Sequence, residues 1–425
     1  MILPVMIQTL PGFRDFYPAD AAARRYVFEK WREVARRYGF VEVDGPTLES
    51  VDLYKKKSGG ELVGQLFNFV DKGEREVALR PEMTPTLARM VATRDRDFKK
   101  PIKWFSVASF FRYEKQQKGR LREFTQLNCD LIGEASPAAD AEMIALAIDL
   151  FRSFGLTADD FFIRVNDRNV WLEFLKAREV PAERAAEFLQ IIDKIERERP
   201  EVSAQKLATF GVTRAELDAF LARPASELGG ALGTLEADLH ARGLTQFVTF
   251  DPRIVRGLAY YTGVVFEVFD RARESRALAG GGRYDELLGT ISDGAVRHPA
   301  LGFAVGDVTL LDLLRALPHT AALLDAATKA DGALDVYVVI AEEAFRPQAL
   351  GLVGQLRAAG RRVDFPLGPQ KVGKQFQAAE TLGATHAAVV GNEWPQIKWK
   401  TLATREEIVV SAWEIASSIA NSRKN

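Results

Sequence analysis

The chain has 425 residues and a formal net charge of −1, with 47% apolar and 27% charged residues. This length predicts two or three domains, and the composition is that of an ordinary globular protein. The near-neutral charge excludes a nucleic-acid binder that is basic over its whole surface, but it leaves room for local basic loops.

The sequence contains no apolar run of the length needed to cross a bilayer, and its opening, MILPVMIQTL, lacks the basic start of a signal peptide. We therefore expect no membrane segment, no signal peptide and a cytoplasmic protein. Cys129 is the only cysteine, which excludes an internal disulfide and suits a reducing compartment. Neither Cys129 nor the four histidines have the spacing of zinc ligands, so we expect no metal centre built from side chains.

The first elements predicted are a helix and a short strand. Residues 19–38 have the apolar spacing of an amphipathic helix, which ends at Gly39. The following stretch, 40–50, reads FVEVDGPTLES and predicts a short strand that Pro46 interrupts. Because proline cannot donate to a sheet ladder, we expect this strand at an edge or an interface.

A second strand, EVALRP at 76–81, leads into a predicted helix. Thr84 is suited to cap that helix, with Pro85 at its first position. Glu82 stands beside the helix N-terminus, where the dipole stabilises a carboxylate and where it can also receive an ammonium group.

Residues 104–133 predict a long antiparallel hairpin, and a long helix, 137–155, follows it. Period-two alternation puts Gln126, Asn128 and Asp130 on one face of the return strand and apolar residues on the other. Such a polar face has two interpretations: the solvent side of a half-covered sheet, or the floor of a binding site.

The tip of the hairpin favours the binding interpretation. Arg112 and Glu114 project from the outgoing strand, and the loop adds basic residues, among them Lys115, Lys118 and Arg120. A basic loop above a sheet that carries an arginine suits a polyphosphate or a nucleic-acid end.

The second half of the chain predicts a helical insertion and then a small domain. Residues 165–245 are charged and rich in Ala, Leu and Glu, as expected of helices inserted between strands. Strands resume at 264–269, and 318–333 is the best linker candidate. Beyond it, strands and helices alternate, which predicts a small, mostly parallel α/β domain.

Two glycine-containing stretches are weak signals by themselves. The three glycines 280–282 allow close backbone approach, but such a cluster is more often a turn. Residues 368–375, GPQKVGKQ, have P-loop spacing, but Gln375 stands where Ser or Thr must hold magnesium, so we reject a P-loop.

Several stretches together resemble one family, the histidyl-tRNA synthetases, which are class II aminoacyl-tRNA synthetases. The resemblance covers essentially the whole chain, and its most specific parts are RGLAYYTG and AGGGRYD. The matching segments are LPGFRDFYP, LRPEMTPTLAR, FFRYEKQQKGRLREFTQ, RGLAYYTGVVFE, AGGGRYDELL and GFAVGD.

The resemblance implies a fold and an activity. The fold would be an α+β catalytic domain, an antiparallel sheet flanked by helices, with a helical insertion, plus a C-terminal α/β anticodon-binding domain. The implied boundaries are 1–325 for the catalytic domain, with the insertion at about 165–245, 326–333 for the linker and 334–425 for the last domain. The implied activity is a histidine–tRNA ligase that uses ATP and Mg²⁺, works as a cytoplasmic homodimer, and has histidine, ATP and histidine tRNA as partners.

The resemblance also implies roles for individual residues. The catalytic residues would be Arg256, between the substrate carboxylate and the α-phosphate, and Arg112, on the α-phosphate of ATP. ATP would further meet Arg120, on its outer phosphates, and Thr309. The histidine-binding residues would be Glu82, Thr84, Gln126, Asp130, Arg256, Tyr260, Tyr261 and Tyr284. The loop residues that face the acceptor end of the tRNA would be Lys115, Gln117 and Lys118.

Three positions depart from the family pattern. Where the third motif, GFxxGxERL, carries an arginine for the γ-phosphate, this chain has Thr309, which cannot form a bidentate charged pair. Ala259 replaces a frequent aspartate, and Gln116 a frequent proline. Arg283 and Arg297 lie near Thr309 in the sequence, but the sequence does not place either of them in the site.

These departures admit an alternative. A paralogue of this fold is a non-catalytic, histidine-binding regulatory subunit of ATP phosphoribosyltransferase, which generally lacks the last domain. A protein that only binds histidine has little use for the phosphate-facing Arg112, Arg120 and Arg256, so the motifs favour the synthetase.

Overall fold

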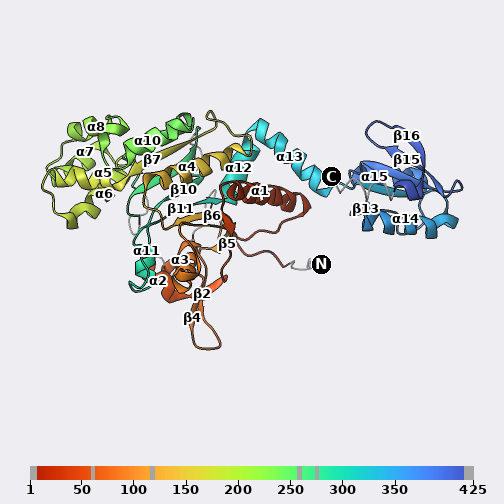
Figure 1. The fold of residues 1–425 in the computed structure, drawn as a ribbon, viewed down its shortest axis with the longest axis horizontal. Helices are drawn as coiled ribbons and strands as arrows, with labels where there is room; N and C mark the ends of the chain where they lie inside the picture. Colours follow the sequence, from red (N-terminus) through yellow and green to blue (C-terminus); the bar gives the residue numbers. More distant parts are fainter. Residues whose placement is uncertain (1–6, 59–62, 115–119, 256–260, 273–276, 416–425) are drawn as a thin grey trace, which may run out of the picture. The chain divides into compact units, whose positions relative to one another are not determined.

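The computed structural model describes residues 7–58, 63–114, 120–255, 261–272 and 277–415 (Figure 1). The chain divides into two compact units: one consists of residues 1–15 and 27–323, the other of residues 16–26 and 324–425. Within the described ranges, no helix is both long and apolar enough to cross a membrane.

The first unit is built on an eight-stranded sheet with the order β1-β5-β6-β11-β10-β9-β7-β8. Its pairings are antiparallel except at the two ends, where β1 runs parallel to β5 and β8 parallel to β7. The strands are β1 (Val41–Glu42), β5 (Ile102–Phe111), β6 (Glu123–Ile132), β7 (Phe161–Asp167), β8 (Val248–Phe250), β9 (Val264–Asp270), β10 (Ala279–Arg283) and β11 (Ala300–Gly306). This sheet confirms the predicted fold class.

The stretch around Pro46 does not form one interrupted strand, so that prediction was wrong. The residues before it form β1, at the edge of the large sheet, and those after it form β2, at the edge of a separate three-stranded sheet. That sheet has the order β2-β4-β3, with β2 (Leu48–Ser50), β3 (Asn68–Val70) and β4 (Glu76–Leu79). Both strands do lie at sheet edges, as expected beside a proline.

Helices flank the large sheet, and α4 and α12 pack against β11 and β6 respectively. The helices of this part are α2 (Val51–Ser58), α3 (Thr84–Thr93), α4 (Pro137–Arg152), α11 (Leu287–Ile291) and α12 (Asp307–Ala316). The helix α1 (Pro18–Arg37) buries Val27, Trp31 and Val34, the apolar face that its sequence predicted.

The predicted hairpin is confirmed as β5 and β6. Their antiparallel register puts Ser106 opposite Asn128, and the bond from Arg112 N to Arg122 O (2.9 Å) extends the ladder beyond β5. Leu127 and Cys129 are fully buried, on the face opposite to that of the polar residues. Burial raises the pKa of the Cys129 thiol well above its ordinary value, which makes it an inert core residue.

The three glycines form the centre of β10, not a turn. A Cβ on Gly281 would lie 2.4 Å from the carbonyl oxygen of Gly302, and a Cβ on Gly282 would lie 2.7 Å from that of Val264. Because these contacts are with backbone, no side chain fits there, and the glycines let β9, β10 and β11 pack closely.

Between β7 and β8 the chain forms a helical segment with an aromatic core. Its helices are α5 (Arg168–Lys176), α6 (Ala185–Lys194), α7 (Pro200–Ala208), α8 (Arg214–Leu221), α9 (Ala225–Leu228) and α10 (Leu232–Ala241). Trp171, Phe174 and Phe188 pack together with ring centroids 5.5 to 5.9 Å apart.

The C-terminal unit has a mixed sheet with the order β13-β12-β14-β15-β16. Its elements are β12 (Val336–Ile340), α14 (Arg346–Ala358), β13 (Val363–Asp364), α15 (Val372–Thr381), β14 (His386–Val390), β15 (Gln396–Thr401) and β16 (Glu407–Ser411). Only β13, β12 and β14 are parallel, so the prediction of a mostly parallel sheet missed the last two strands. Residues 318–332, expected to act as a linker, form the helix α13 (Pro318–Gly332).

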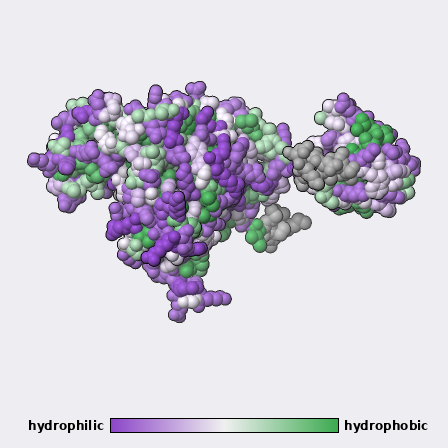
Figure 2. All heavy atoms as spheres, in the orientation of Figure 1, coloured by the Kyte–Doolittle hydropathy of each residue, from purple (hydrophilic) through white to green (hydrophobic). Residues whose placement is uncertain are grey.

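Gln375, at the position where a P-loop carries Ser or Thr, has a structural role instead. The side chain is fully buried; its Oε1 accepts from Ile340 N (2.8 Å) and its Nε2 donates to Ile340 O (2.9 Å). The residue therefore fixes α15 to β12. Figure 2 shows apolar side chains gathered on the surface of this unit, whose exposed apolar residues include Ile408, Val409 and Trp413.

Candidate active site

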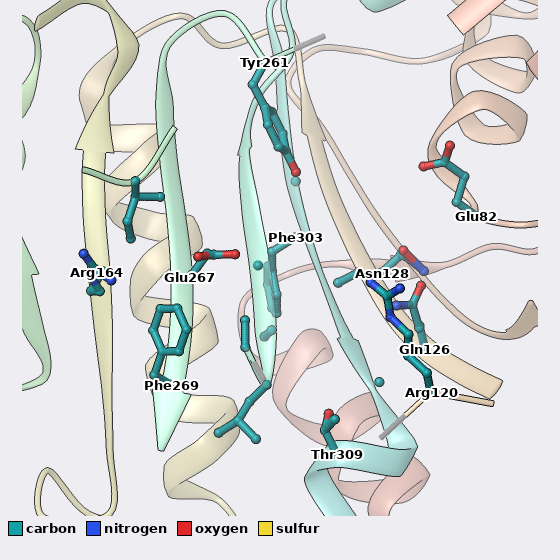
Figure 3. A pocket seen from close by; sticks show the side chains of 18 of the residues that line it. Glu82, Arg120, Gln126, Asn128, Arg164, Tyr261, Glu267, Phe269, Phe303 and Thr309 are labelled. Carbon is teal, nitrogen blue, oxygen red and sulfur yellow. The ribbon is translucent and has the colours of Figure 1, made fainter. Parts of the chain in front are cut away.

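A cavity of about 1220 Å³ lies on one face of the large sheet (Figure 3). Its lining comes from β6, β7, β9, β10 and β11, from the residues before and at the start of α3, and from the start of α12. The structure brings the following predicted site residues together in this lining: Glu82, Thr84, Arg112, Arg120, Gln126, Asp130, Tyr261, Tyr284 and Thr309.

Other predicted site residues lie outside the described ranges. They are Arg256, Tyr260, Lys115, Gln117 and Lys118. Ala259 and Gln116 lie outside them as well.

The floor of the cavity is the polar face of β6. Gln126, Asn128 and Asp130 all line it, as the period-two alternation predicted. The hydroxyl of Tyr284 donates a hydrogen bond to Oδ1 of Asp130, and both side chains are buried. This end of the cavity therefore offers a buried carboxylate whose position is fixed by a tyrosine.

Tyr261 also lines the cavity, and its hydroxyl group is directed into it in Figure 3. Its carbonyl oxygen accepts a hydrogen bond from Nη1 of Arg168, the first residue of α5. Burial lowers the pKa of Arg168 below its ordinary value, although the guanidinium stays charged. Arg168, which the sequence reasoning missed, thus positions the backbone of Tyr261.

A second carboxylate, Glu82, stands just before α3. The helix begins at Thr84, its N-cap residue is Met83, and no side chain caps it, so the prediction that Thr84 is the cap was wrong. Thr84 instead lines the cavity together with Glu82, and Pro85 follows in the first turn. The hydroxyl group is therefore not occupied in capping the helix.

Arginines occupy the next part of the cavity. Arg112 Nε donates to the carbonyl of Pro81 (3.0 Å), and its guanidinium lies 5.3 Å from the ring centroid of Phe124. Arg120 forms an ion pair with Glu114, with 2.6 Å between Nη1 and Oε2. Such fixed guanidinium groups suit the oxygens of phosphates.

Thr309 lines the cavity in the first turn of α12. The preceding Asp307 is fully buried; its Oδ1 accepts from Thr125 N (3.0 Å) and its Oδ2 from Arg14 (2.8 Å). The bond from Thr125 fixes the start of α12 to β6, the strand that carries the cavity floor, and the bond from Arg14 ties it to the N-terminal segment.

The two arginines considered as substitutes for the missing one do not line the cavity. Arg283 is buried and binds Asp140 through Nε (3.2 Å) and Nη2 (2.7 Å), and Arg297 lies 3.6 Å from Glu286 on the surface. Burial raises the pKa of Asp140 to about 6, although Arg283 acts in the opposite direction.

Arg164, Glu196 and Arg253 also line the cavity and were missed by the sequence reasoning, and they share ion pairs with Asp251, which is not part of the lining. Asp251 binds both Arg164 (2.5 Å) and Arg253 (2.8 Å). Burial opposes ionisation of Asp251, but the two arginines hold its pKa below the ordinary value. Glu196 pairs with the same arginines. Arg164, Glu196 and Asp251 are far apart in the sequence, and no local motif marks them.

Glu267 and Phe303 also line the cavity and were not assigned roles from the sequence. Each lies inside a stretch that carried the family resemblance, VVFE and GFAVG, which was the available signal. The described residues contain no group of three or more His, Cys, Asp or Glu side chains that could hold a metal ion.

The site therefore combines carboxylates, among them Glu82 and Asp130, with arginines, among them Arg112 and Arg120. Carboxylates suit an ammonium group or a ring N–H, and arginines suit phosphates. The arrangement can hold an amino acid and a nucleotide next to each other.

Comparisons with known proteins identify the family of the chain. Residues 12–310 match the sequence model of the family described as histidyl-tRNA synthetase, and residues 335–422 match that of the anticodon binding domain. A histidine–tRNA ligase of Opitutus terrae is 44% identical over 435 residues, which cover 97% of this chain and 98% of that protein.

Solved structures show the same fold. The apo histidyl-tRNA synthetase of Staphylococcus aureus has a TM-score of 0.72 and 25% identity, covering 98% of this chain and 100% of that one. A protein of Bacillus halodurans described as an ATP phosphoribosyltransferase regulatory subunit/histidyl-tRNA synthetase has a TM-score of 0.67 and 23% identity. The match covers 88% of this chain and 97% of that one.

Proposed function

The chain belongs to the histidyl-tRNA synthetase family and is a histidine–tRNA ligase, and from this premise we propose how its residues divide the work. The substrates of such a ligase are histidine, ATP and tRNA. The observation that carries the proposal is the shared cavity, in which the Asp130–Tyr284 pair and Arg112 meet.

Histidine would bind between Glu82 and Asp130. Glu82, Thr84 and Gln126 would receive its α-ammonium group, and Asp130 would accept a ring N–H, with Tyr260 and Tyr261 beside the imidazole and Tyr284 behind Asp130. A buried acceptor discriminates strongly, because an amino acid without a matching N–H leaves it unpaired.

ATP would bind along the arginines. Arg112 would hold the α-phosphate and Arg120 the outer phosphates, with Thr309 as a neutral donor where an arginine is usual. Arg256 would lie between the α-phosphate and the carboxylate of histidine. Bringing these two anions together needs charge compensation and alignment more than it needs a base.

Two bond exchanges follow. A carboxylate oxygen of histidine attacks the α-phosphorus, the bond to the bridging oxygen breaks, and pyrophosphate leaves. A ribose hydroxyl of the terminal adenosine then attacks the histidyl carbonyl carbon, and AMP leaves. Lys115, Gln117 and Lys118 would face this end of the tRNA, and the unit from residue 334 would bind the anticodon.

Magnesium fits as a partner of ATP. Since the described residues form no metal-binding cluster, the ion would be held mainly by the phosphates, with Glu114 or Glu267 as the lining carboxylates. It would supply charge neutralisation on the leaving pyrophosphate. We also infer a cytoplasmic homodimer that involves the edge strands around Pro46.

The test is histidine-dependent exchange of labelled pyrophosphate into ATP by the purified chain without tRNA. Exchange with histidine and with no other amino acid is expected. Tight histidine binding without exchange would contradict the proposal and favour a sensor of histidine. The Arg256→Ala variant should lose exchange much more than histidine affinity, and unchanged kinetics would remove Arg256 from its role.

A further inference from the structure

Asn128 lies at the centre of the cavity floor and has no role so far. It is placed on β6 between Gln126 and Asp130, lines the cavity, and is 5% exposed. Figure 3 shows its side chain next to that of Gln126. Within the described part of the chain, its Nδ2 donates to no acceptor.

An unpaired donor of this kind is unusual, because nearly all buried polar groups in folded proteins have partners. Asn166, on β7, has the same donor with partners, although its own Oδ1 accepts from no donor among the described residues. It is fully buried, and its Nδ2 donates to Pro252 O (3.1 Å) and Ile254 O (2.8 Å). Unlike Asn166, Asn128 borders a cavity, so a ligand can supply the acceptor. A half-turn about its Cβ–Cγ bond presents either end of the carboxamide to that cavity.

The neighbours of Asn128 indicate which ligand atom would accept its hydrogen bond. Successive residues on one face of a strand are about 6.6 Å apart, so Asn128 lies under the middle of a ligand that spans from Gln126 to Asp130. In the proposed function the ammonium group and the imidazole already have partners at the two ends. Between them lies Cα, which carries the α-carboxylate, and of the two oxygens of this group Arg256 is the only assigned partner.

We propose that Asn128 is a substrate-binding residue whose carboxamide donates a hydrogen bond to the α-carboxylate of histidine. This inference rests on the proposed function. A neutral donor on one carboxylate oxygen fixes its orientation and leaves the other oxygen directed at the α-phosphorus. The amide adds no charge, so it does not compete with the phosphates for Arg112 or Arg256.

Histidinol, which has the imidazole and the ammonium group but no carboxylate, isolates this contact. In pyrophosphate exchange, Asn128→Ala should raise the KM for histidine about 10-fold or more. The inhibition constant of histidinol should change less than about 2-fold, since the lost hydrogen bond does not involve it. Asn128→Asp should raise the KM further, because its carboxylate repels that of the substrate.

Ser106→Ala is the matched control. Ser106 is buried opposite Asn128 on β5 but does not line the cavity. The KM of the Ser106→Ala variant for histidine should therefore equal that of the unaltered chain. Equal weakening of histidine and histidinol by Asn128→Ala, or no weakening of either, would overturn the inference. If the alanine variant does not fold, the isosteric Asn128→Asp carries the same comparison. Failure of the unaltered chain to catalyse exchange would instead contradict the proposed function.

Discussion

The hydroxyl of Tyr284 donates a hydrogen bond to the carboxylate of Asp130 across 154 residues of sequence. Asp130 belongs to β6 and Tyr284 directly follows β10, with β11 between the two strands. Both side chains are buried at the end of the cavity where histidine is proposed to bind. The tyrosine thus fixes the carboxylate before any substrate arrives.

Tyr284→Phe tests this relationship. Because a hydrogen bond to a charged group contributes about 1.5–3 kcal/mol, the variant should raise the KM for histidine about 10-fold or more. The KM for ATP should stay unchanged. The control is Tyr54→Phe, since Tyr54 is a buried tyrosine of the same unit outside the cavity. The same KM for histidine in Tyr284→Phe and in the unaltered chain would exclude this positioning role.

Thr309→Arg should strengthen ATP binding. An arginine at the first turn of α12 adds a cation beside the phosphate-facing arginines, so we expect the KM for ATP to fall by about 3- to 10-fold. Ala316→Arg is the control, because it adds the same single positive charge at an exposed position of the same helix, outside the cavity. An equal decrease in both variants would show a general charge effect, and an increase in Thr309→Arg would show that the cavity has no room for the side chain.

Gly281→Ala should destabilise the sheet. The added Cβ would lie 2.4 Å from the carbonyl oxygen of Gly302 and 2.5 Å from Cβ of Phe303, so the backbone must move. This movement should lower the free energy of unfolding by about 3 kcal/mol or more. Gly289→Ala, on α11, is the control. Its added Cβ would lie 3.5 Å from the nearest atom, Cγ of Arg297, which is an ordinary contact. This change should raise the free energy of unfolding by about 0.5–1 kcal/mol. Urea unfolding of both variants measures the two changes in the free energy of unfolding. Equal changes would contradict the packing argument.

Asp140 should give stability a distinct dependence on pH. Its folded-state pKa, raised by burial to about 6 from an ordinary 3.8, lies above the unfolded value, so the folded state binds the proton more tightly. The contribution of Asp140 to the free energy of unfolding is therefore fully present below pH 3.8 and is lost as the pH rises through 6. Relative to Asp140→Asn, the unaltered chain should gain about 1 kcal/mol of unfolding free energy between pH 7 and pH 5. Parallel pH profiles of the two proteins would contradict the raised pKa.

Local patterns predicted the elements whose periodicity is strong. The alternation in FTQLNCDLIG predicted both the strand and the face of Gln126 and Asp130, because one face of β6 is core and the other is cavity. The error at Thr84 is a shift of one residue: the chain enters the helix at Met83, in helical backbone geometry, before the threonine is reached. The two strands around Pro46 were merged because sequence does not show to which sheet a short strand pairs.

The rest of the site depends on pairing between distant segments. Arg164 and Asp251 are 87 residues apart and meet because β7 and β8 pair in parallel, which no local pattern encodes. The strand β15 and its partner β16 follow the last predicted element and have no helix before them, so the alternation that marked the α/β part gave no signal for them.

The order of the large sheet also determines when the protein becomes functional during its synthesis. β11, which ends at Gly306, lies between β6 and β10, so β6, paired with β5, and β10, paired with β9, each keep one unpaired edge until the ribosome has completed it. Chain extension proceeds at about 5–20 residues per second, so β6 waits roughly 10 to 35 seconds for this strand. During that interval the nascent chain exposes sheet edges that invite pairing with other chains. Synthesis up to α12 is therefore the period in which this protein most needs protection from aggregation.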